Sequence, residues 1–250
     1  MNNFESSFLS NLSTSHFWGQ QNRHFVVSAS SSGINTLMQV VYPKGSRNPS
    51  GPVSGGCGFD LVPTNTVIKS NAILSFQYQV YFPPDFNFNL GGKLPGLFGG
   101  HANCTGGDKA TNCFDARIMW RRNGQGEAYV YLPRQAQVPN FCTTPPVTTC
   151  NPVYGISIGR GSFKFLKNQW NTIRMLLKAN SSPTSQDGWL RVDWNNQIAI
   201  NMKNLAWRTQ DNVTGTGVDF STFYGGSSDP FNAPETTFAL FKGARFDIFQ

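Results

Sequence analysis

The feature that most constrains the fold of this chain is an alternation of apolar and polar side chains with a period of two residues. It is clearest in residues 74–82, LSFQYQVYF. One face of this segment would carry Leu74, Phe76, Tyr78, Val80 and Phe82, and the other Ser75, Gln77, Gln79 and Tyr81. Because successive side chains of a β-strand point to opposite faces, this pattern predicts a strand with one buried face.

The same period predicts further short strands along most of the chain. They cover residues 116–121, 127–132, 170–178, 188–194 and 197–201, and residues 236–250 form one or two more. Asn195 and Asn196 join two of these strands and are residue types that tolerate the positive φ of a tight hairpin turn. With no convincing long helix, the pattern predicts an all-β fold: a jelly-roll sandwich of antiparallel sheets with a concave substrate-binding face.

Composition agrees with a compact domain of this class. Only 13% of the residues are charged, whereas 14% are aromatic, including 21 Phe. That much aromatic surface can bury a core, which excludes a disordered chain, and no apolar run reaches the roughly 18 residues of a membrane helix. We predict a single domain over residues 1–250, with residues 1–20 as a loosely attached N-terminal segment.

Cysteine spacing bears on the compartment. Cys104 and Cys113 bracket one polar loop, and Cys142 and Cys150 bracket another, so we predict two disulfides and an oxidising, extracellular setting. Cys57 is then left over. Five unpaired thiols in a cytosolic protein are the alternative. The first 17 residues lack the basic and apolar regions of a signal peptide, so the prediction of a secreted protein depends on the cysteines.

The charge balance indicates an anionic partner. Lys and Arg number 20 against 13 Asp and Glu, a net charge of +7, yet the longest basic run is Arg121-Arg122. Nucleic-acid and membrane-binding segments concentrate their basic residues in runs, so neither partner is predicted. Dispersed cations on a β-surface fit a groove for an anionic ligand, and a scatter of solubilising lysines is the alternative.

Two kinds of site are disfavoured by what the sequence lacks. Glycoside hydrolases require two carboxylates that face the sugar, but of three glutamates only Glu127 lies in a predicted strand, without an acidic residue two or four positions away. Carboxylates from separate strands are the remaining route to a hydrolase. The three histidines are not spaced for a metal, and we predict neither a metal nor another cofactor.

Three segments place reactive side chains on strands. Residues 91–100, GGKLPGLFGG, hold a single Lys93. The other two segments put Asp115, Arg117, Met119 and Arg121 on one face, and Glu127, Tyr129 and Tyr131 on one face. If these two strands pair as a hairpin, their arginines and tyrosines converge. Each part has a plainer explanation, because such tyrosines often pack across strands and a glycine-flanked lysine often lies in a solvated loop.

Lysine, arginine and tyrosines without a carboxylate pair suit a lyase that acts on a uronate. β-Elimination removes the C5 proton next to the substrate's own carboxylate, and cations or hydrogen-bond donors stabilise the developing enediolate. A neutral lysine or a tyrosinate can take the proton, and a tyrosine hydroxyl can protonate the leaving oxygen.

The segments KLPGLFGG, ARIMWRR and YVYLP, in this order, resemble polysaccharide lyase family 14, over roughly residues 60–250. The resemblance implies a jelly-roll fold and an alginate or glucuronan lyase. It places the family's functional lysine on Lys93, its arginine on Arg117 and its active-site tyrosines on Tyr129 and Tyr131. Lysine and tyrosine would supply base and acid in an unassigned order, while the arginine holds the substrate.

One residue departs from the family pattern, since Asp115 stands where a small hydroxyl residue is expected. An acid there would repel the substrate unless Arg117 or Arg121 paired with it. The candidates for binding further parts of the substrate are Asp115, Arg121, Gln77, Gln79, Tyr81, His101, Lys164 and Arg174.

We therefore predict a secreted, monomeric polysaccharide lyase that cleaves an anionic polyuronate, alginate (polymannuronate) or glucuronan. A non-catalytic module that binds acidic carbohydrates through the same side chains is the alternative.

Overall fold

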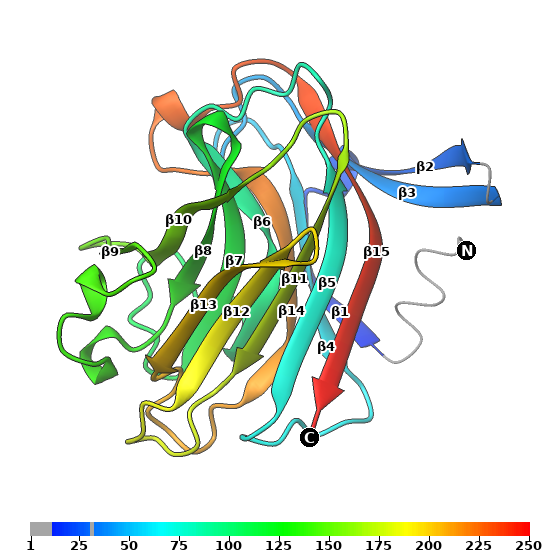
Figure 1. The fold of residues 1–250 in the computed structure, drawn as a ribbon. Coiled ribbons are helices and arrows are strands. Elements are labelled where there is room, and N and C mark those ends of the chain that lie inside the picture. The colour runs from blue at the N-terminus through cyan, green and yellow to red at the C-terminus, as the bar shows by residue number, and fades with distance from the viewer. Residues whose placement is uncertain (1–11, 31–32) are drawn as a thin grey trace.

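The computed structural model describes residues 12–30 and 33–250, which form two antiparallel β-sheets packed face to face (Figure 1). The first sheet has the strand order β1-β4-β14-β6-β7-β8-β10-β9. Its strands are β1 (Leu12–Trp18), β4 (Cys57–Pro63), β14 (Gly215–Tyr224), β6 (Gly91–Gly100), β7 (Cys113–Arg121), β8 (Gln125–Tyr131), β10 (Ile156–Lys164) and β9 (Thr148–Cys150).

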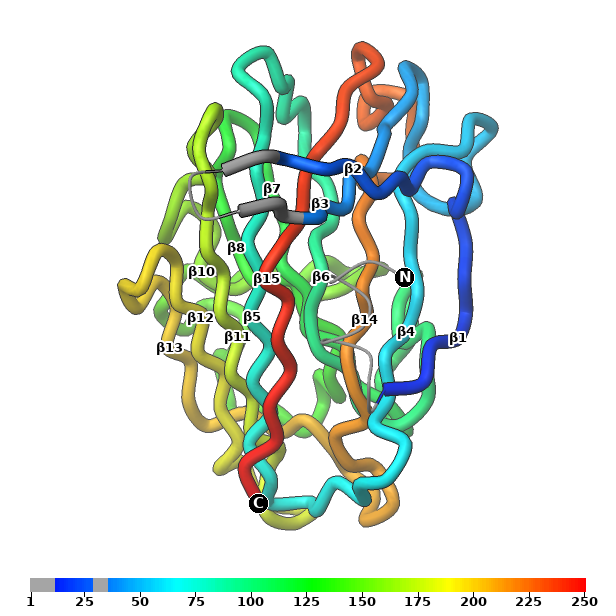
Figure 2. Tube along the Cα trace, turned by 90° about the vertical axis from the view of Figure 1, so that its right-hand side faces the viewer, coloured from blue at the N-terminus to red at the C-terminus, as the bar shows by residue number. Residues whose placement is uncertain are grey.

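The second sheet has the order β13-β12-β11-β5-β15-β3-β2. Its strands are β13 (Gln197–Leu205), β12 (Gly188–Trp194), β11 (Trp170–Lys178), β5 (Ile73–Tyr81), β15 (Thr237–Phe249), β3 (Gly33–Tyr42) and β2 (Arg23–Ser30). Figure 2 shows β15 running along most of this sheet, and Figure 1 shows the β2–β3 hairpin projecting from the body.

Helical structure in the described residues is limited to single 3₁₀ turns. These are η1 (Gln20–Asn22), η2 (Arg122–Gly124), η3 (Arg134–Ala136), η4 (Phe141–Thr143) and η5 (Asp229–Phe231). Among these residues we find no helix with the length and apolar character needed to span a membrane.

The core lies between the sheets and is strongly aromatic. Phe76 and Tyr78 of β5, Trp120 of β7 and Phe241 of β15 are all essentially inaccessible to solvent. Burial alternates residue by residue along β11, as a strand with one covered face requires. The predicted all-β sandwich is therefore confirmed, and each sheet keeps one outward face that is available for function.

The predicted strands are found, with shifted ends. The turn at Asn195 and Asn196 has positive φ at both residues, 47° and 63°, as expected for a tight hairpin. Residues 237–249 form the single strand β15, with a register shift between Lys242 and Arg245 rather than a break into two strands.

The N-terminal prediction needs correction where the structure describes it. Residues 12–18 are not a loosely attached segment, because they form β1 and pair with β4 of the first sheet. Most residues of β4 are buried, so its backbone groups need protein partners on both sides, and β1 supplies one set of them. Residues 1–11 lie outside the described residues.

Both predicted disulfides are present. Cys104 is bonded to Cys113 and Cys142 to Cys150, while Cys57 is a buried free thiol. Each disulfide closes a loop at the first sheet, and the loop closed by Cys104 and Cys113 connects β6 to β7.

Candidate active site

The three segments singled out in the sequence form adjacent strands of the first sheet. Strand register places Arg117 of β7 opposite Tyr129 of β8, and Asp115 opposite Tyr131. On the other side of β7, Lys93 of β6 lies opposite Met119. Paired residues of antiparallel strands share a face, so lysine, arginine and both tyrosines gather on the outward face of this sheet.

A β-bulge in β6 turns Lys93 outward. Leu94 and Leu97 both reach the core, although strict alternation would put residues three apart on opposite faces. The pairing with β7 shifts register between Leu94 and Gly96, and Pro95, which has no N–H to donate, lies at the shift. A Cβ at Gly96 would lie 1.9 Å from the Ala116 carbonyl oxygen, so the close approach of β6 and β7 requires glycine there.

Lys93 is a buried amine in an unusual setting. The residue is 7% exposed, and its Nζ has no hydrogen-bond partner among the described residues. Nζ lies 3.7 Å from the ring centre of Tyr129 and 5.9 Å from that of Tyr131. Burial, and next the positive charge of Arg117, hold the pKa of Lys93 well below its ordinary value. The neutral amine, which can accept a proton, is therefore favoured.

Tyr129 is tuned in the opposite sense. Burial, and next the neighbouring Tyr131, raise the pKa of Tyr129 to about 12, against a smaller lowering by Arg121. Tyr129 is therefore a protonated hydroxyl at neutral pH and can donate a proton. The two tyrosine rings meet edge to face with centres 6.0 Å apart.

Arg117 is almost entirely enclosed by protein oxygen atoms. The residue is 3% exposed. Its Nε donates to Asp115 (2.9 Å), Nη1 to Ser221 Oγ (2.9 Å) and Nη2 to Thr105 Oγ1 (2.7 Å). Nη1 also lies 3.2 Å from a carboxylate oxygen of Asp219. Most of the guanidinium fork is thus fixed by the protein, which leaves little of it to turn toward a ligand.

Asp115 is paired with Arg117, which offsets part of its negative charge when the acid is ionised. Burial, together with the second acid Asp219, raises the pKa of Asp115 to about 7 against the lowering effect of Arg117. Two carboxylates share one guanidinium, so one of them is readily protonated near neutral pH.

Sequence reasoning did not single out the residues that complete this cluster. Asp219 and Ser221 come from β14, which pairs with β6 although it follows about 120 residues later in the chain. Thr105 comes from the loop between β6 and β7. The family pattern places a small hydroxyl residue at position 115. Here Ser221 and Thr105 supply hydroxyl groups that accept hydrogen bonds from Arg117.

A second ion cluster surrounds Glu127, which is 0% exposed. Its carboxylate accepts hydrogen bonds from Arg121 Nε, Ser157 Oγ and Arg160 Nε, each at 2.7 Å. The guanidinium carbon of Arg121 lies 5.4 Å from the ring centre of Tyr129. Glu127 therefore fixes Arg121 beside the tyrosine and is not one of two carboxylates facing a substrate.

Residues 155–159, GISIG, match the Gly-x-Ser-x-Gly pattern of a hydrolase nucleophile. That nucleophile needs a sharp turn between a strand and a helix, whereas Ser157 lies within β10 and is buried against Glu127. The match carries no catalytic serine.

Several predicted substrate-binding residues are not brought to this face. Gln77, Gln79 and Tyr81 of β5 and Arg174 of β11 lie on the outward face of the second sheet, where Gln77 is directly opposite Arg174. These residues therefore do not lie beside Lys93, because alternation shows which side chains point outward but not from which sheet they do so.

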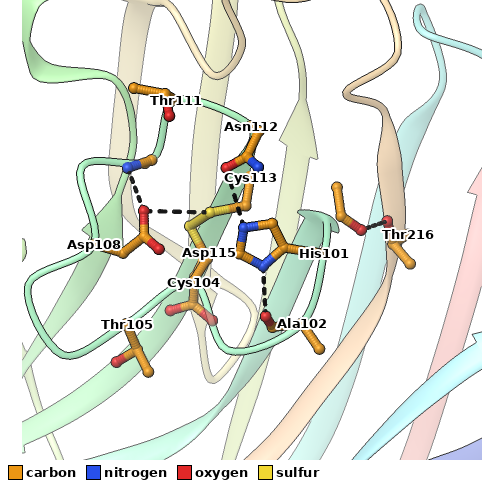
Figure 3. Close-up of a disulfide and its surroundings, with 12 residues drawn as sticks. His101, Ala102, Cys104, Thr105, Asp108, Thr111, Asn112, Cys113, Asp115 and Thr216 are labelled. Carbon is orange, nitrogen blue, oxygen red and sulfur yellow. Dashed lines mark hydrogen bonds between the residues drawn. A yellow bond between two sulfur atoms is a disulfide. The ribbon is translucent and has the colours of Figure 1, made fainter.

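Two other candidates lie at the margins of the first sheet. Lys164 is exposed at the end of β10 and lines a cavity of about 810 Å³ that also includes Arg122 and Lys167 but none of the four predicted catalytic residues. The His101 ring bonds to the Ala102 carbonyl oxygen (2.7 Å) and to Asn112 Oδ1 (3.1 Å), so it holds its own loop together (Figure 3).

Ligand atoms of His101, Asp108 and Cys113 lie within 4.8 Å of one another. The Cys113 sulfur is already bonded to Cys104, so two exposed side chains remain, fewer than a metal site needs.

A jelly-roll sandwich with lysine, arginine and tyrosines gathered on one sheet is the arrangement expected of a polysaccharide lyase, the class of enzyme predicted from the sequence. The model of one family in this class, Polysaccharide lyase 14, matches residues 30–244. The chain belongs to polysaccharide lyase family 14.

Solved structures agree with this assignment. The marine PL-14 alginate lyase from Aplysia kurodai is 32% identical, with a TM-score of 0.82 over 93% of this chain and 89% of that one. Alginate lyase vAL-1 from Chlorella virus is 25% identical, with a TM-score of 0.77 over 96% and 94% of the two chains. The Exolysin of Paramecium bursaria Chlorella virus 1 is 24% identical over 68% of this chain, which spans only 28% of that longer protein.

Proposed function

We propose that this chain cleaves alginate, or a closely related polyuronate, by β-elimination at the face formed by β6, β7 and β8. The observation that carries the proposal is the buried Lys93 amine, which lies against Tyr129, has no hydrogen-bond partner among the described residues and has its pKa lowered by burial. A binding module would gain nothing from an uncharged lysine, because a charged amine attracts a uronate more strongly. The similarity to the alginate lyases from Aplysia kurodai and Chlorella virus supports alginate as the substrate.

Lys93 and Tyr129 fit the two proton transfers. Lys93 Nζ takes the C5 proton, the electron pair forms the C4–C5 double bond, and the C4–O bond to the next sugar breaks. The departing oxygen takes a proton from the Tyr129 hydroxyl, which its pKa of about 12 keeps protonated. Tyr131, 4% exposed, forms the wall that holds the Tyr129 ring.

Arg117 supplies positive charge next to the reacting carboxylate. Since most of its donors are bound to protein oxygen atoms, it acts through its field and through the placement of its neighbours rather than as a free clamp. Arg121 and Arg160, which share Glu127, extend the positive charge along the same sheet.

Product absorbance tests the function directly. We expect incubation with polymannuronate, polyguluronate or polyglucuronate to raise absorbance near 235 nm, where an unsaturated uronate absorbs, with the largest rate on one of the two alginate components. A flat trace with retained binding would favour the non-catalytic module, and new reducing ends without that absorbance would favour a hydrolase.

An anionic polysaccharide is the partner that the family and the net charge of +7 support. Secretion is supported by the two disulfides, which persist in oxidising compartments. A monomeric state and the lack of a metal or other cofactor are predictions from the sequence.

Asp115 should give the reaction an alkaline limit. Above its pKa of about 7 the carboxylate ionises and adds negative charge beside Lys93, Arg117, Asp219 and Tyr131, so a uronate binds less well. We expect KM to rise above pH 7 by up to roughly tenfold per pH unit. In Asp115→Asn, which keeps an oxygen for Arg117 Nε, KM should stay level between pH 6 and 9. An equal rise in both proteins would show that another group is responsible.

A further inference from the structure

The loop between β6 and β7 is closed by a disulfide at the edge of the active site (Figure 3). Cys113 is the first residue of β7, so the Cys104–Cys113 bond ties the loop directly to the strand that carries Asp115 and Arg117. Within the loop, Asp108 Oδ1 accepts a hydrogen bond from the Ala110 N–H (2.7 Å).

This loop makes two contacts with site residues. The Thr105 hydroxyl oxygen accepts a hydrogen bond from Arg117 Nη2 at 2.7 Å, the shortest of the three hydrogen bonds to that guanidinium described above. The disulfide and Ala110 form a small buried cluster with Tyr131, against which Tyr129 packs. A twelve-residue surface loop thus reaches both the arginine and the tyrosines.

Thr105 directly follows Cys104, so its position depends on the disulfide. Thr105 is half-buried, and its N–H donates a hydrogen bond to the Asn103 carbonyl oxygen (2.7 Å). Asn103 has a positive φ of 62°, a conformation that asparagine adopts readily. The bond between Cys104 and Cys113 joins the residue next to Thr105 to the first residue of β7.

The second disulfide offers a comparison inside the same molecule. Cys142 and Cys150 close a loop of nearly equal size, and their side chains pack against the main core rather than against the tyrosine cluster. Losing either disulfide frees a similar length of chain, but only one of them carries a hydrogen-bond partner of Arg117.

We propose that Thr105 is a positioning residue for the lyase reaction, and that the Cys104–Cys113 disulfide holds its hydroxyl on Arg117 and its loop against Tyr131. This inference rests on the proposed function for its kinetic consequences, while the contact between Thr105 and Arg117 can be tested without catalysis. Thr105 acts through Arg117, whose positive charge adds to the effect of burial in lowering the pKa of Lys93.

Two substitutions at position 105 separate this role from simple packing. Thr105→Val keeps the shape and removes the acceptor, whereas Thr105→Ser keeps the acceptor and removes a methyl group. We expect kcat/KM to fall about tenfold in Thr105→Val and to stay within about twofold of wild type in Thr105→Ser, as the loss of a hydrogen bond to a charged group predicts. Equal rates in both variants would overturn the proposal.

The pH profile adds a readout that loss of packing would not move. If Arg117 is less firmly held, its charge acts less on Lys93, the pKa of Lys93 rises, and the amine is neutral only at higher pH. The acid limb of the kcat/KM profile should therefore move up by a few tenths of a pH unit in Thr105→Val and stay in place in Thr105→Ser. A shift to lower pH would contradict the proposed coupling.

The disulfides are compared in two double variants. Cys104→Ala with Cys113→Ala should lose about tenfold or more in kcat/KM, whereas Cys142→Ala with Cys150→Ala should stay within about threefold, both assayed well below their melting temperatures because each loses a stabilising crosslink. Similar losses in the two variants would indicate a general effect of chain freedom.

Exchange of the Arg117 Nη2–H protons, which include the donor to Thr105, is followed by NMR and assigned by its loss in Arg117→Met, and it decides the contact independently of activity. It should be faster in Thr105→Val than in Thr105→Ser or wild type. If the wild type forms no unsaturated product, the proposed function is wrong, but the exchange rates still show whether Thr105 holds Arg117. Unchanged exchange in all three proteins would overturn the positioning role.

Discussion

Replacing Lys93 by Met should abolish most of the lyase activity without lowering the stability of the fold. Lys93 is the buried amine that we assign as the base, and loss of a general base commonly costs 10²–10⁴-fold in rate. Met has a similar length and no charge to bury, while the wild-type Nζ is enclosed without a hydrogen-bond partner among the described residues. Burying such a polar group costs free energy, so its removal favours the folded state.

The expected result is therefore a kcat lower by about 10³-fold together with a Tm equal to or above that of wild type. Product absorbance and thermal unfolding at pH 7.5 measure the two quantities. Lys203→Met is the matched control, because Lys203 is exposed on β13 of the other sheet; its kcat should be unchanged. An active Lys93→Met enzyme would remove Lys93 from the role of base, and an inactive one that has also lost its fold would show that the amine is structural.

The central residues of the site could be predicted from sequence because their strands are consecutive. β6, β7 and β8 follow one another and pair in chain order, so the alternation in β7 and β8 also fixes which of their side chains meet. The hairpin that places Arg117 opposite Tyr129 is a local structure, and local pairing is what a pattern of period two specifies.

The partners of Arg117 could not be predicted in the same way. Asp219 and Ser221 reach it because β14 lies beside β6, an arrangement that depends on the order of strands in the sheet rather than on any local pattern. Periodicity also does not reveal the bulge at Pro95. This bulge lets both Leu94 and Leu97 of β6 face the core while Lys93 faces outward. Strand order and bulges follow from packing of the whole sandwich.

A related reason explains why some predicted substrate-binding residues lie on the second sheet, away from Lys93. Gln79 and Tyr81 are outward-facing, as the alternation predicts, but both faces of a sandwich look alike in sequence. Gln79 donates a hydrogen bond to Thr172 of β11, and Tyr81 donates one to Asn168 just before β11, so both side chains bond within or next to the second sheet. The sequence alone does not distinguish polar residues that line a binding face from polar residues that are only exposed to solvent, because it does not show which strands share a sheet.

Replacing Arg117 by Met should produce the largest loss of stability at this site. The substitution leaves Asp115, buried, and Asp219 without their shared cation, and breaking a buried ion pair from one side costs about 3–5 kcal/mol. For a chain of this size we expect Tm to fall by about 10 °C at pH 8. The fall should be smaller at pH 5, below the Asp115 pKa of about 7, because the protonated acid no longer needs the cation.

A second substitution and a matched ion pair complete this test by thermal unfolding. Arg117→Met with Asp115→Asn should recover most of the lost Tm at pH 8 but little of the activity, because the buried charge is removed while the positive field at the reacting carboxylate is still missing. Arg191 and Asp193 form a comparable pair two residues apart on β12, with Arg191 41% exposed. Arg191→Met should cost no more than about 1 kcal/mol, as solvent-exposed ion pairs do. A similar loss of Tm in Arg117→Met and Arg191→Met would mean that the two acids at Arg117 are already neutral in the folded enzyme, and that Arg117 is held mainly by Ser221 and Thr105.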